Sequence, residues 1–177
     1  KHQQVLPNGL PENTIWSLLS DETGRLWIGT YSKGLWLYDP YYDKFPGFSH
    51  NPFDPHSLSH NTVTDFAEIG SDQLLVATDG GGLSLFESHP DEGYRGTVTP
   101  EWLKNLPSEN LTTLLLSKDQ QLWIGTWGSG IEQIDLANKT RKNHLLSPAP
   151  GAANNIFSLY NDASGHLWAG TAGQGLF

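Results

Sequence analysis

The residues of this sequence that could catalyse a reaction do not form a known catalytic pattern. A Gly-x-Ser-x-Gly segment, which would place a nucleophilic serine on a sharp turn, occurs nowhere in the 177 residues. The run from Asp79 to Gly82 follows a predicted strand but leads into another strand, so it lacks the helix N-terminus that binds phosphate. Two carboxylates on one loop face could still cleave a glycoside, and this alternative stays open. We therefore predict no catalytic residue and a protein that is not an enzyme.

Residues suited to metal binding have simpler explanations. Three histidines crowd the linker 49–62, whose two prolines favour an extended surface loop over a fixed ligand geometry: His50, His56 and His60. Asp21 and Asp162 each begin an Asp-x-x-Gly turn, which lacks the successive acidic ligands of a calcium loop. An aspartate that hydrogen-bonds its own turn accounts for both. The sequence predicts no metal site and no cofactor.

Four residues are candidates for binding a small ligand, because each stands in a turn after a predicted strand. Tyr31 and Trp127 offer flat apolar ring faces on which a sugar can stack. Asp79 can accept hydrogen bonds from hydroxyl groups, and Gln174 lies in the corresponding turn near the end of the chain. Ordinary solvated turn residues are the alternative interpretation for all four.

The element that must position these turns is a repeat. Leu-Trp-Ile-Gly-Thr at 26–30 recurs in related form 48, 96 and 141 residues further on, at 74–78, 122–126 and 167–171. Eight residues after the first leucine of each copy stands a glycine followed by an aliphatic residue: Gly34, Gly82, Gly130 and Gly175. Landmarks that keep their spacing across four copies indicate one structural unit written nearly four times.

Each unit has the periodicity of short strands joined by tight turns. In the first copy, strands are expected at 15–19, 26–30 and 35–38, with a weaker fourth at 44–48. A helical pattern is confined to a single turn at 101–106. Four antiparallel strands in 45 to 48 residues form the blade of a β-propeller. We predict an all-β protein of three full blades plus a partial fourth, at about 13–48, 61–99, 110–146 and 154–177, in one propeller domain spanning 1–177.

The tryptophan of the second strand is expected to be a buried wedge between blades. This applies to Trp27, Trp123 and Trp168, whereas the second copy has Leu75 and Ala77 in place of Trp and Gly. Slightly different packing is expected in that blade. The glycine of the Gly-Thr step should let neighbouring backbone approach closely.

These motifs resemble the two-component regulator propeller repeat: an aliphatic strand, Asp-x-x-Gly, Leu-Trp-Ile-Gly-Thr, and Gly-Leu-x-x-Tyr/Phe. The linker 56–63 is similar to the phrase that joins blades in that family. The resemblance implies the extracytoplasmic, periplasmic sensor region of a bacterial hybrid histidine kinase or diguanylate cyclase receptor, sensing a ligand that is often a carbohydrate. A propeller glycosidase or polysaccharide lyase, and a purely structural propeller segment, are the alternatives.

Charge and hydropathy restrict the partners. Ten Lys and Arg against nineteen Asp and Glu leave a net charge of −9, which argues against nucleic acid. No apolar run reaches the 18 residues that a membrane span needs.

The last copy stops early in its third strand, and 1–6 have the character of an outer strand of a neighbouring or closing blade. We therefore expect self-association through the open propeller ends, as a homodimer or another assembly, besides a small-molecule or oligosaccharide ligand.

Overall fold

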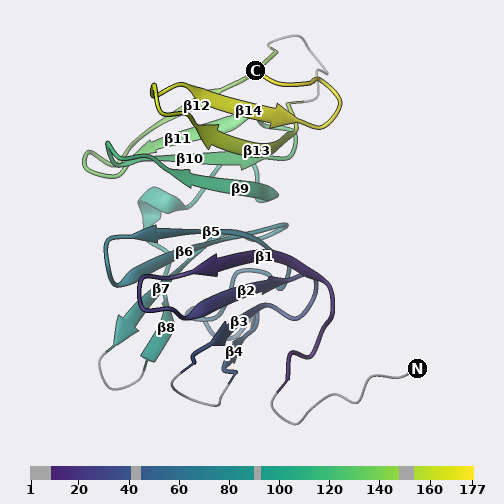
Figure 1. Cartoon of the computed structure of the whole chain (residues 1–177), viewed down its shortest axis with the longest axis vertical. Coiled ribbons are helices and arrows are strands. Elements are labelled where there is room, and N and C mark those ends of the chain that lie inside the picture. Colours follow the sequence, from purple (N-terminus) through teal and green to yellow (C-terminus); the bar gives the residue numbers. More distant parts are fainter. Residues whose placement is uncertain (1–8, 41–44, 90–92, 148–153) are drawn as a thin grey trace.

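The computed structural model describes residues 9–40, 45–89, 93–147 and 154–177 as a succession of small antiparallel sheets. Figure 1 shows four such sheets, which are the blades. The first strand of every blade lies on the same side of the molecule. The prediction of propeller blades is confirmed. The expected outer strand at 1–6 lies outside the described residues. No helix in the described part is long and apolar enough to cross a membrane.

The four blades follow the sequence in order. Blade 1 contains β1 (Ile15–Ser20), β2 (Leu26–Thr30), β3 (Leu35–Tyr38) and β4 (Gly47–Phe48), and blade 2 contains β5 (Val63–Ile69), β6 (Gln73–Thr78), β7 (Gly82–His89) and β8 (Gly93–Thr97). A 3₁₀ turn, η1 (Glu101–Leu103), leads to blade 3, with β9 (Leu111–Leu116), β10 (Gln121–Thr126), β11 (Ile131–Asp135) and β12 (Thr140–His144). Blade 4 contains β13 (Ile156–Asn161) and β14 (Leu167–Thr171), with a single bridge from Gly170 to Leu176.

The threonine of the Gly-Thr step, which is Ala-Thr in blade 2, builds the turn between the second and third strands in every blade. The threonine hydroxyl donates to the carbonyl of the glycine four residues on, at 2.8 to 2.9 Å, from Thr30, Thr78, Thr126 and Thr171. At Gly34 the backbone φ is +77°, and a Cβ atom there would meet the Phe48 carbonyl oxygen at 2.2 Å. The sequence needs glycine at this position for both reasons.

Blades pack on one another through apolar side chains from both faces. Between blades 1 and 2, the ring of Trp27 stands edge-on to Tyr94 of β8, with 4.6 Å between ring centroids. The glycine step lets the next blade come close, because a Cβ atom on Gly29 would lie 2.7 Å from the Val63 side chain. In blade 2, Leu75 and Ala77 are completely buried against blade 3, which confirms that this variant copy forms a full blade.

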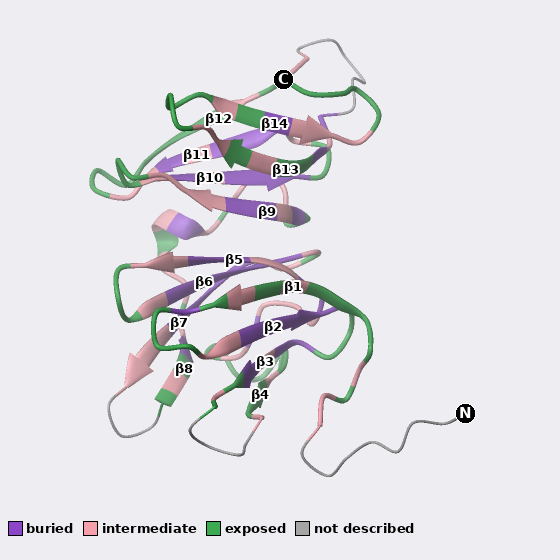
Figure 2. Cartoon of the chain, in the orientation of Figure 1, coloured by how far each residue is buried: buried purple, intermediate pink, exposed green. Residues whose placement is uncertain are grey.

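Burial of the motif tryptophan declines along the chain, and here the sequence prediction is partly wrong. Trp27 is fully buried, Trp123 is half-buried, and Trp168 is 39% exposed. The cause is the neighbour each ring faces. In the described structure, blade 4 offers only β13, β14 and one bridge to cover Trp123, and no described blade follows Trp168. Figure 2 shows that buried positions are concentrated in β2, β6 and β10, whereas β1 and β13 carry exposed ones.

Candidate functional site

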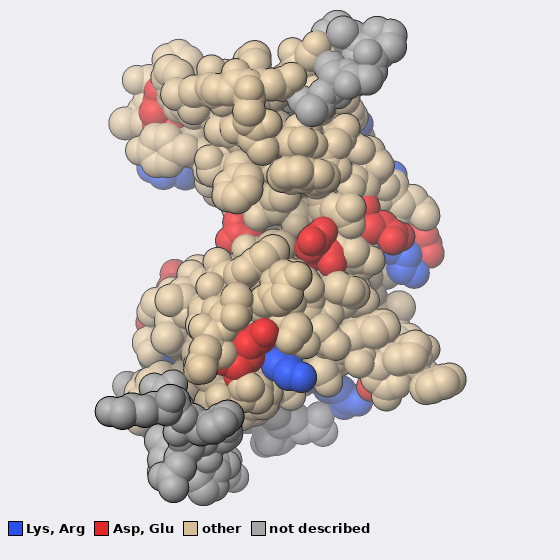
Figure 3. Space-filling view, turned by 90° about the vertical axis from the view of Figure 1, so that its right-hand side faces the viewer, with Lys and Arg blue, Asp and Glu red and all other residues tan. Residues whose placement is uncertain are grey.

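The first strands of the four blades lie side by side and border a hollow of about 910 Å³. Figure 3 shows the molecule notched between its upper and lower halves. The residues lining the hollow come from β1, β5, β9 and β13, from the turns after β6 and β10, and from the residue before β9: Ile15, Trp16, Ser17, Leu18, Thr64, Asp65, Asp79, Asn110, Leu111, Thr112, Thr113, Trp127 and Phe157. Because every blade contributes to it, this hollow is where propeller geometry brings distant parts of the sequence together.

A β-bulge in each first strand turns one side chain out of the regular alternation. The pairing with the second strand skips one residue, so that Ile15 pairs with Thr30 and Ser17 with Gly29, leaving Trp16 unpaired. The same shift leaves Thr64, Thr112 and Phe157 unpaired in the other three blades. Bulges re-aim side chains in this way. All four bulge residues line the hollow.

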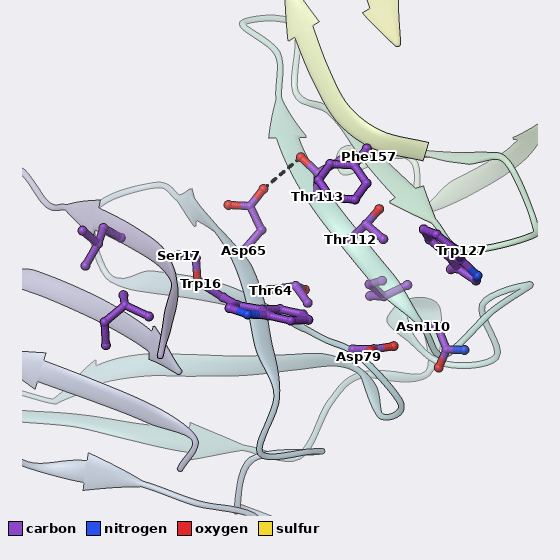
Figure 4. A pocket seen from close by; sticks show the side chains of 13 residues that line it. Trp16, Ser17, Thr64, Asp65, Asp79, Asn110, Thr112, Thr113, Trp127 and Phe157 are labelled. Atoms are coloured by element: carbon purple, nitrogen blue, oxygen red, sulfur yellow. Dashed lines mark hydrogen bonds between the residues drawn. The ribbon is translucent and has the colours of Figure 1, made fainter. Parts of the chain in front are cut away.

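Aromatic rings surround the hollow and remain accessible. Trp16 and Tyr31 lie 5.1 Å apart between ring centroids, with their planes tilted by 48°. Trp127 is 47% exposed and Phe157 is 68% exposed. In Figure 4, Trp16 and Trp127 lie on opposite sides of the hollow. Open ring faces around a concavity suit a ligand that stacks flat apolar surfaces on them.

Two carboxylates add polar character. The Asp65 carboxylate accepts hydrogen bonds across the blade joint, from the Leu114 N–H at 2.7 Å and the Thr113 hydroxyl at 3.0 Å (Figure 4), and from the Phe66 N–H at 2.9 Å. Burial raises the pKa of Asp65, and these three hydrogen bonds oppose the rise. The half-buried Asp79 lies beside Asn110, to which it is joined by a backbone bridge. The site thus has one carboxylate that links blades 2 and 3 and a second at its rim.

Backbone hydrogen bonds fix the turns that carry the rim residues. In each blade the residue after the threonine that ends the second strand donates its N–H to a carbonyl just before the first strand, as Tyr31 does to Thr14 and Trp127 to Asn110. The Glu12 carboxylate accepts hydrogen bonds from the backbone N–H and the hydroxyl of Ser32, at 2.8 and 3.0 Å. The rim is therefore held in place before any ligand arrives.

The four ligand-binding candidates from the sequence fall in different places. Asp79 and Trp127 line the hollow, and Tyr31 stands next to it against Trp16. Gln174 lies in the exposed turn of blade 4, where its N–H donates to the Thr171 hydroxyl, and it is not among the lining residues. The structure thus brings three of the four candidates to one side of the molecule.

Sequence reasoning missed Trp16, Asp65 and Phe157. All three lie in first strands, whereas the sequence analysis looked for binding residues in the turns that follow second strands. The available signal was comparison between copies: the second residue of the first strand is Trp, Thr, Thr or Phe, whereas the residue two further on is Leu or Phe in every copy.

The structure also locates the residues considered for metal binding. Among the described residues, no group of three His, Cys, Asp or Glu side chains is placed to hold a metal ion. The ring of His50 bonds the Leu58 carbonyl at 2.7 Å, and His60 bonds the Thr62 N–H at 3.2 Å. Asp21 and Asp162 each accept hydrogen bonds from backbone N–H groups of their own turn, as the sequence predicted.

Comparison with known sequences identifies the repeat. Residues 9–32, 105–128 and 150–173 match the family model described as two component regulator propeller. The chain contains two-component regulator propeller repeats. The matched segments cover the start of blades 1, 3 and 4 and omit the second copy, in which Leu75 and Ala77 replace the usual Trp and Gly. The family prediction is confirmed.

Individual relatives are much longer than this chain. The histidine kinase P4 of Formosa agariphila is 29% identical over 150 residues, which are 80% of this chain and 10% of the kinase. The extracellular domain of a putative hybrid two component system from B. thetaiotaomicron superposes with a TM-score of 0.78 at 26% identity, covering 99% of this chain and 23% of that domain. A virginiamycin B lyase from Staphylococcus aureus shares the fold, at 14% identity and a TM-score of 0.62. The superposition covers 91% of this chain and 50% of the lyase chain.

Proposed function

We propose that this chain is a non-enzymatic, ligand-binding propeller segment from the extracytoplasmic, periplasmic region of a bacterial signalling receptor, and that its ligand is a carbohydrate. The repeat family, the histidine kinase relative and the extracellular domain of similar fold support the receptor assignment. The observation that carries the binding assignment is the hollow itself, because four blades direct accessible aromatic rings and hydrogen-bonding groups into it.

A sugar ring fits the chemistry of the hollow. Its C–H faces can stack on Trp16 and Trp127, which border the hollow from opposite sides. Its hydroxyl groups can donate to the Asp79 carboxylate and bond the Asn110 amide. A cavity lined mainly by apolar groups, with a few polar groups to orient the ligand, is the usual form of a small-molecule site.

The test measures the binding of a panel of oligosaccharides by calorimetry and by tryptophan fluorescence. Trp127→Ala should weaken binding at least tenfold, because each stacked ring contributes a large apolar contact. The matched control is Phe53→Ala, which removes a 93% exposed aromatic from the linker and away from the hollow. Equal loss of binding in both variants, or binding that neither variant changes, would show that the hollow is not the site.

The enzyme alternative has its own observation, since Asp65 and Asp79 place two carboxylates in the hollow and one neighbour of similar fold is a lyase. Against this, Asp65 already accepts three hydrogen bonds, two of which join blades 2 and 3. The same oligosaccharides should be recovered unchanged after prolonged incubation. Product above the blank, lost in Asp79→Asn, would replace the sensor proposal by a glycosidase or lyase.

A further inference from the structure

The charge of the hollow points to a narrower class of ligand than carbohydrates in general. Among its described lining residues two are carboxylates, Asp65 and Asp79, and none is Lys, Arg or His. At the surrounding rim, the Glu12 carboxylate accepts hydrogen bonds from Ser32, in the turn beside Tyr31. The basic residues at this rim are Lys33, in the same turn as Ser32, and His60, whose ring lies beside Gly80 in the turn after Asp79. Acidic groups thus outnumber basic ones where a ligand would enter.

The two lining carboxylates differ in how much of their bonding capacity is already used. Asp65 accepts three hydrogen bonds from the protein, whereas the described residues supply none to the carboxylate of the half-buried Asp79. An ionised carboxylate is an acceptor only, so Asp79 needs donors from a ligand or from water. Hydroxyl, amide and ammonium groups are such donors, and carboxylate and sulfate groups are not.

A negatively charged ligand would also meet like charge in a concave, partly desolvated space. Clefts lined by charge of one sign concentrate the field, and like charges brought together there are penalised more than in open water. The net charge of −9 adds a repulsive background of the same sign.

Building on the proposed function, we propose that this hollow selects saccharides whose polar groups are hydroxyl, amide or amine, and that it rejects uronic acid and sulfated sugars through Asp79. The aromatic rings supply affinity that is common to all sugars, and the carboxylate of Asp79 supplies the discrimination. This assigns a specificity-determining role to a residue whose backbone N–H bonds the Thr62 carbonyl and whose side chain lines the hollow.

The experiment compares a neutral glucan hexasaccharide with the same hexasaccharide oxidised at its C6 positions to glucuronic acid. Calorimetry at about 20 mM salt should give at least tenfold weaker binding for the oxidised sugar. The difference should shrink at about 1 M salt, where the Debye length falls to roughly 3 Å. Asp79→Asn keeps the size of the side chain and its acceptor oxygen while removing the charge, and should restore most of the lost affinity.

The chain offers a matched control in the same blade. Asp72 precedes β6 and Asp79 follows it, so the two carboxylates lie at opposite ends of one six-residue strand. Asp72→Asn removes the same charge from the protein but should leave the preference unchanged. If the oxidised sugar binds as tightly as the neutral one, or if Asp72→Asn and Asp79→Asn act alike, the selectivity proposal is wrong while the binding function stands. If neither sugar nor any member of the wider panel binds, both proposals fail.

Discussion

Trp27 and Trp168 occupy the same position of the repeat in blades 1 and 4, yet only one of them is buried. Both indoles donate to the aspartate that begins the preceding turn, Trp27 to Asp21 at 3.3 Å and Trp168 to Asp162 at 3.0 Å. Trp27 is fully buried by blade 2, whereas Trp168 is 39% exposed at the open end. The motif thus specifies the strand and the turn, and the neighbouring blade determines the burial.

The largest expected consequence concerns the open face of blade 4. Tyr160 and Trp168 are paired across β13 and β14, in the position of Leu19 and Trp27, but Tyr160 is 65% exposed. The corresponding residue is half-buried in blades 1 and 3, as Leu19 and Leu115, and buried in blade 2, as Ala67. We propose that blade 1 of a second copy covers Tyr160, presenting Leu18 and Trp36. Two such contacts close a symmetric pair without open ends.

Sedimentation at low micromolar concentration should therefore show a dimer. Tyr160→Lys should dissociate it, because the substitution places a charge in an apolar interface, and Phe53→Lys, in the exposed linker, should not. Single copies of the unaltered chain, or a dimer that survives Tyr160→Lys, would contradict the contact.

The next largest effect is expected on the stability of the fold, at Trp27, the buried tryptophan of the pair. Trp27→Ala should lower the free energy of unfolding by about 3–5 kcal/mol, because it empties a fully buried position between Phe48 and Tyr94. Urea denaturation followed by circular dichroism measures this. A loss below about 1 kcal/mol would show that blades 1 and 2 do not pack as described.

Trp123→Ala should be intermediate, at about 1–3 kcal/mol. The sequence alone predicted a fully buried ring here, but blade 4 covers it only in part, and its aromatic neighbour is His144 of its own blade, at 5.5 Å between centroids. The same denaturation experiment ranks it against Trp27→Ala. If both losses were equal, burial by the following blade would not be the deciding factor.

A smaller effect on stability is expected in acid, at Asp162 of blade 4. Hydrogen bonds, first from the Trp168 indole and then from the His166 N–H, lower the pKa of Asp162 to about 2, against slight desolvation. In the unfolded chain its pKa is about 3.9. Because the folded value is lower, this group stabilises the fold fully above pH ~4, and the contribution is lost as the pH falls through about 2.

An NMR titration of the Asp162 carboxyl carbon checks the pKa directly. Trp168→Phe keeps a ring but removes the indole donor, and should raise the pKa of Asp162 toward its ordinary value. A titration curve that this substitution does not move would show that the indole hydrogen bond is absent in solution.

The smallest effect is expected at Trp127. Trp127→Ala should change the free energy of unfolding by no more than about 0.5 kcal/mol, because the ring projects from a turn and is 47% exposed. Together with its predicted effect on sugar binding, this separates a ligand-binding tryptophan from the structural Trp27. A large loss of stability would mean that the ring packs on the blade instead.

The sequence predicts local features of this molecule well because one repeat fixes each of them with several residues. The turn after β2 requires both a threonine hydroxyl and a glycine at positive φ, so its place can be found by spacing alone. The exposed ring of Trp127 and the lining position of Asp79 follow from that turn. Burial of Trp123 and Trp168 could not be predicted, since it depends on how much of the next blade is present.

The hollow was predicted only in part, because its inner residues depend on a bulge. Regular alternation along β1 would send successive side chains to opposite faces, but the skipped pairing at Trp16 breaks this alternation, and Ile15, Trp16 and Ser17 all line the hollow. A single skipped hydrogen-bond pair leaves little trace in composition or spacing. Asp65 was missed for a related reason, since its partners Thr113 and Leu114 lie 48 and 49 residues away in another blade.

The four bulges also separate the residues that form the wall of the hollow from the residues that hold each blade together by strand pairing. Each blade presents one side chain that its own strand pairing does not constrain, and in this chain those four positions hold a tryptophan, two threonines and a phenylalanine. A substitution at such a position changes the wall of the hollow without disturbing the ladder that holds the blade. Under the proposed function, ligand preference would therefore change one blade at a time through these four positions, while the strand pairing of each blade is kept.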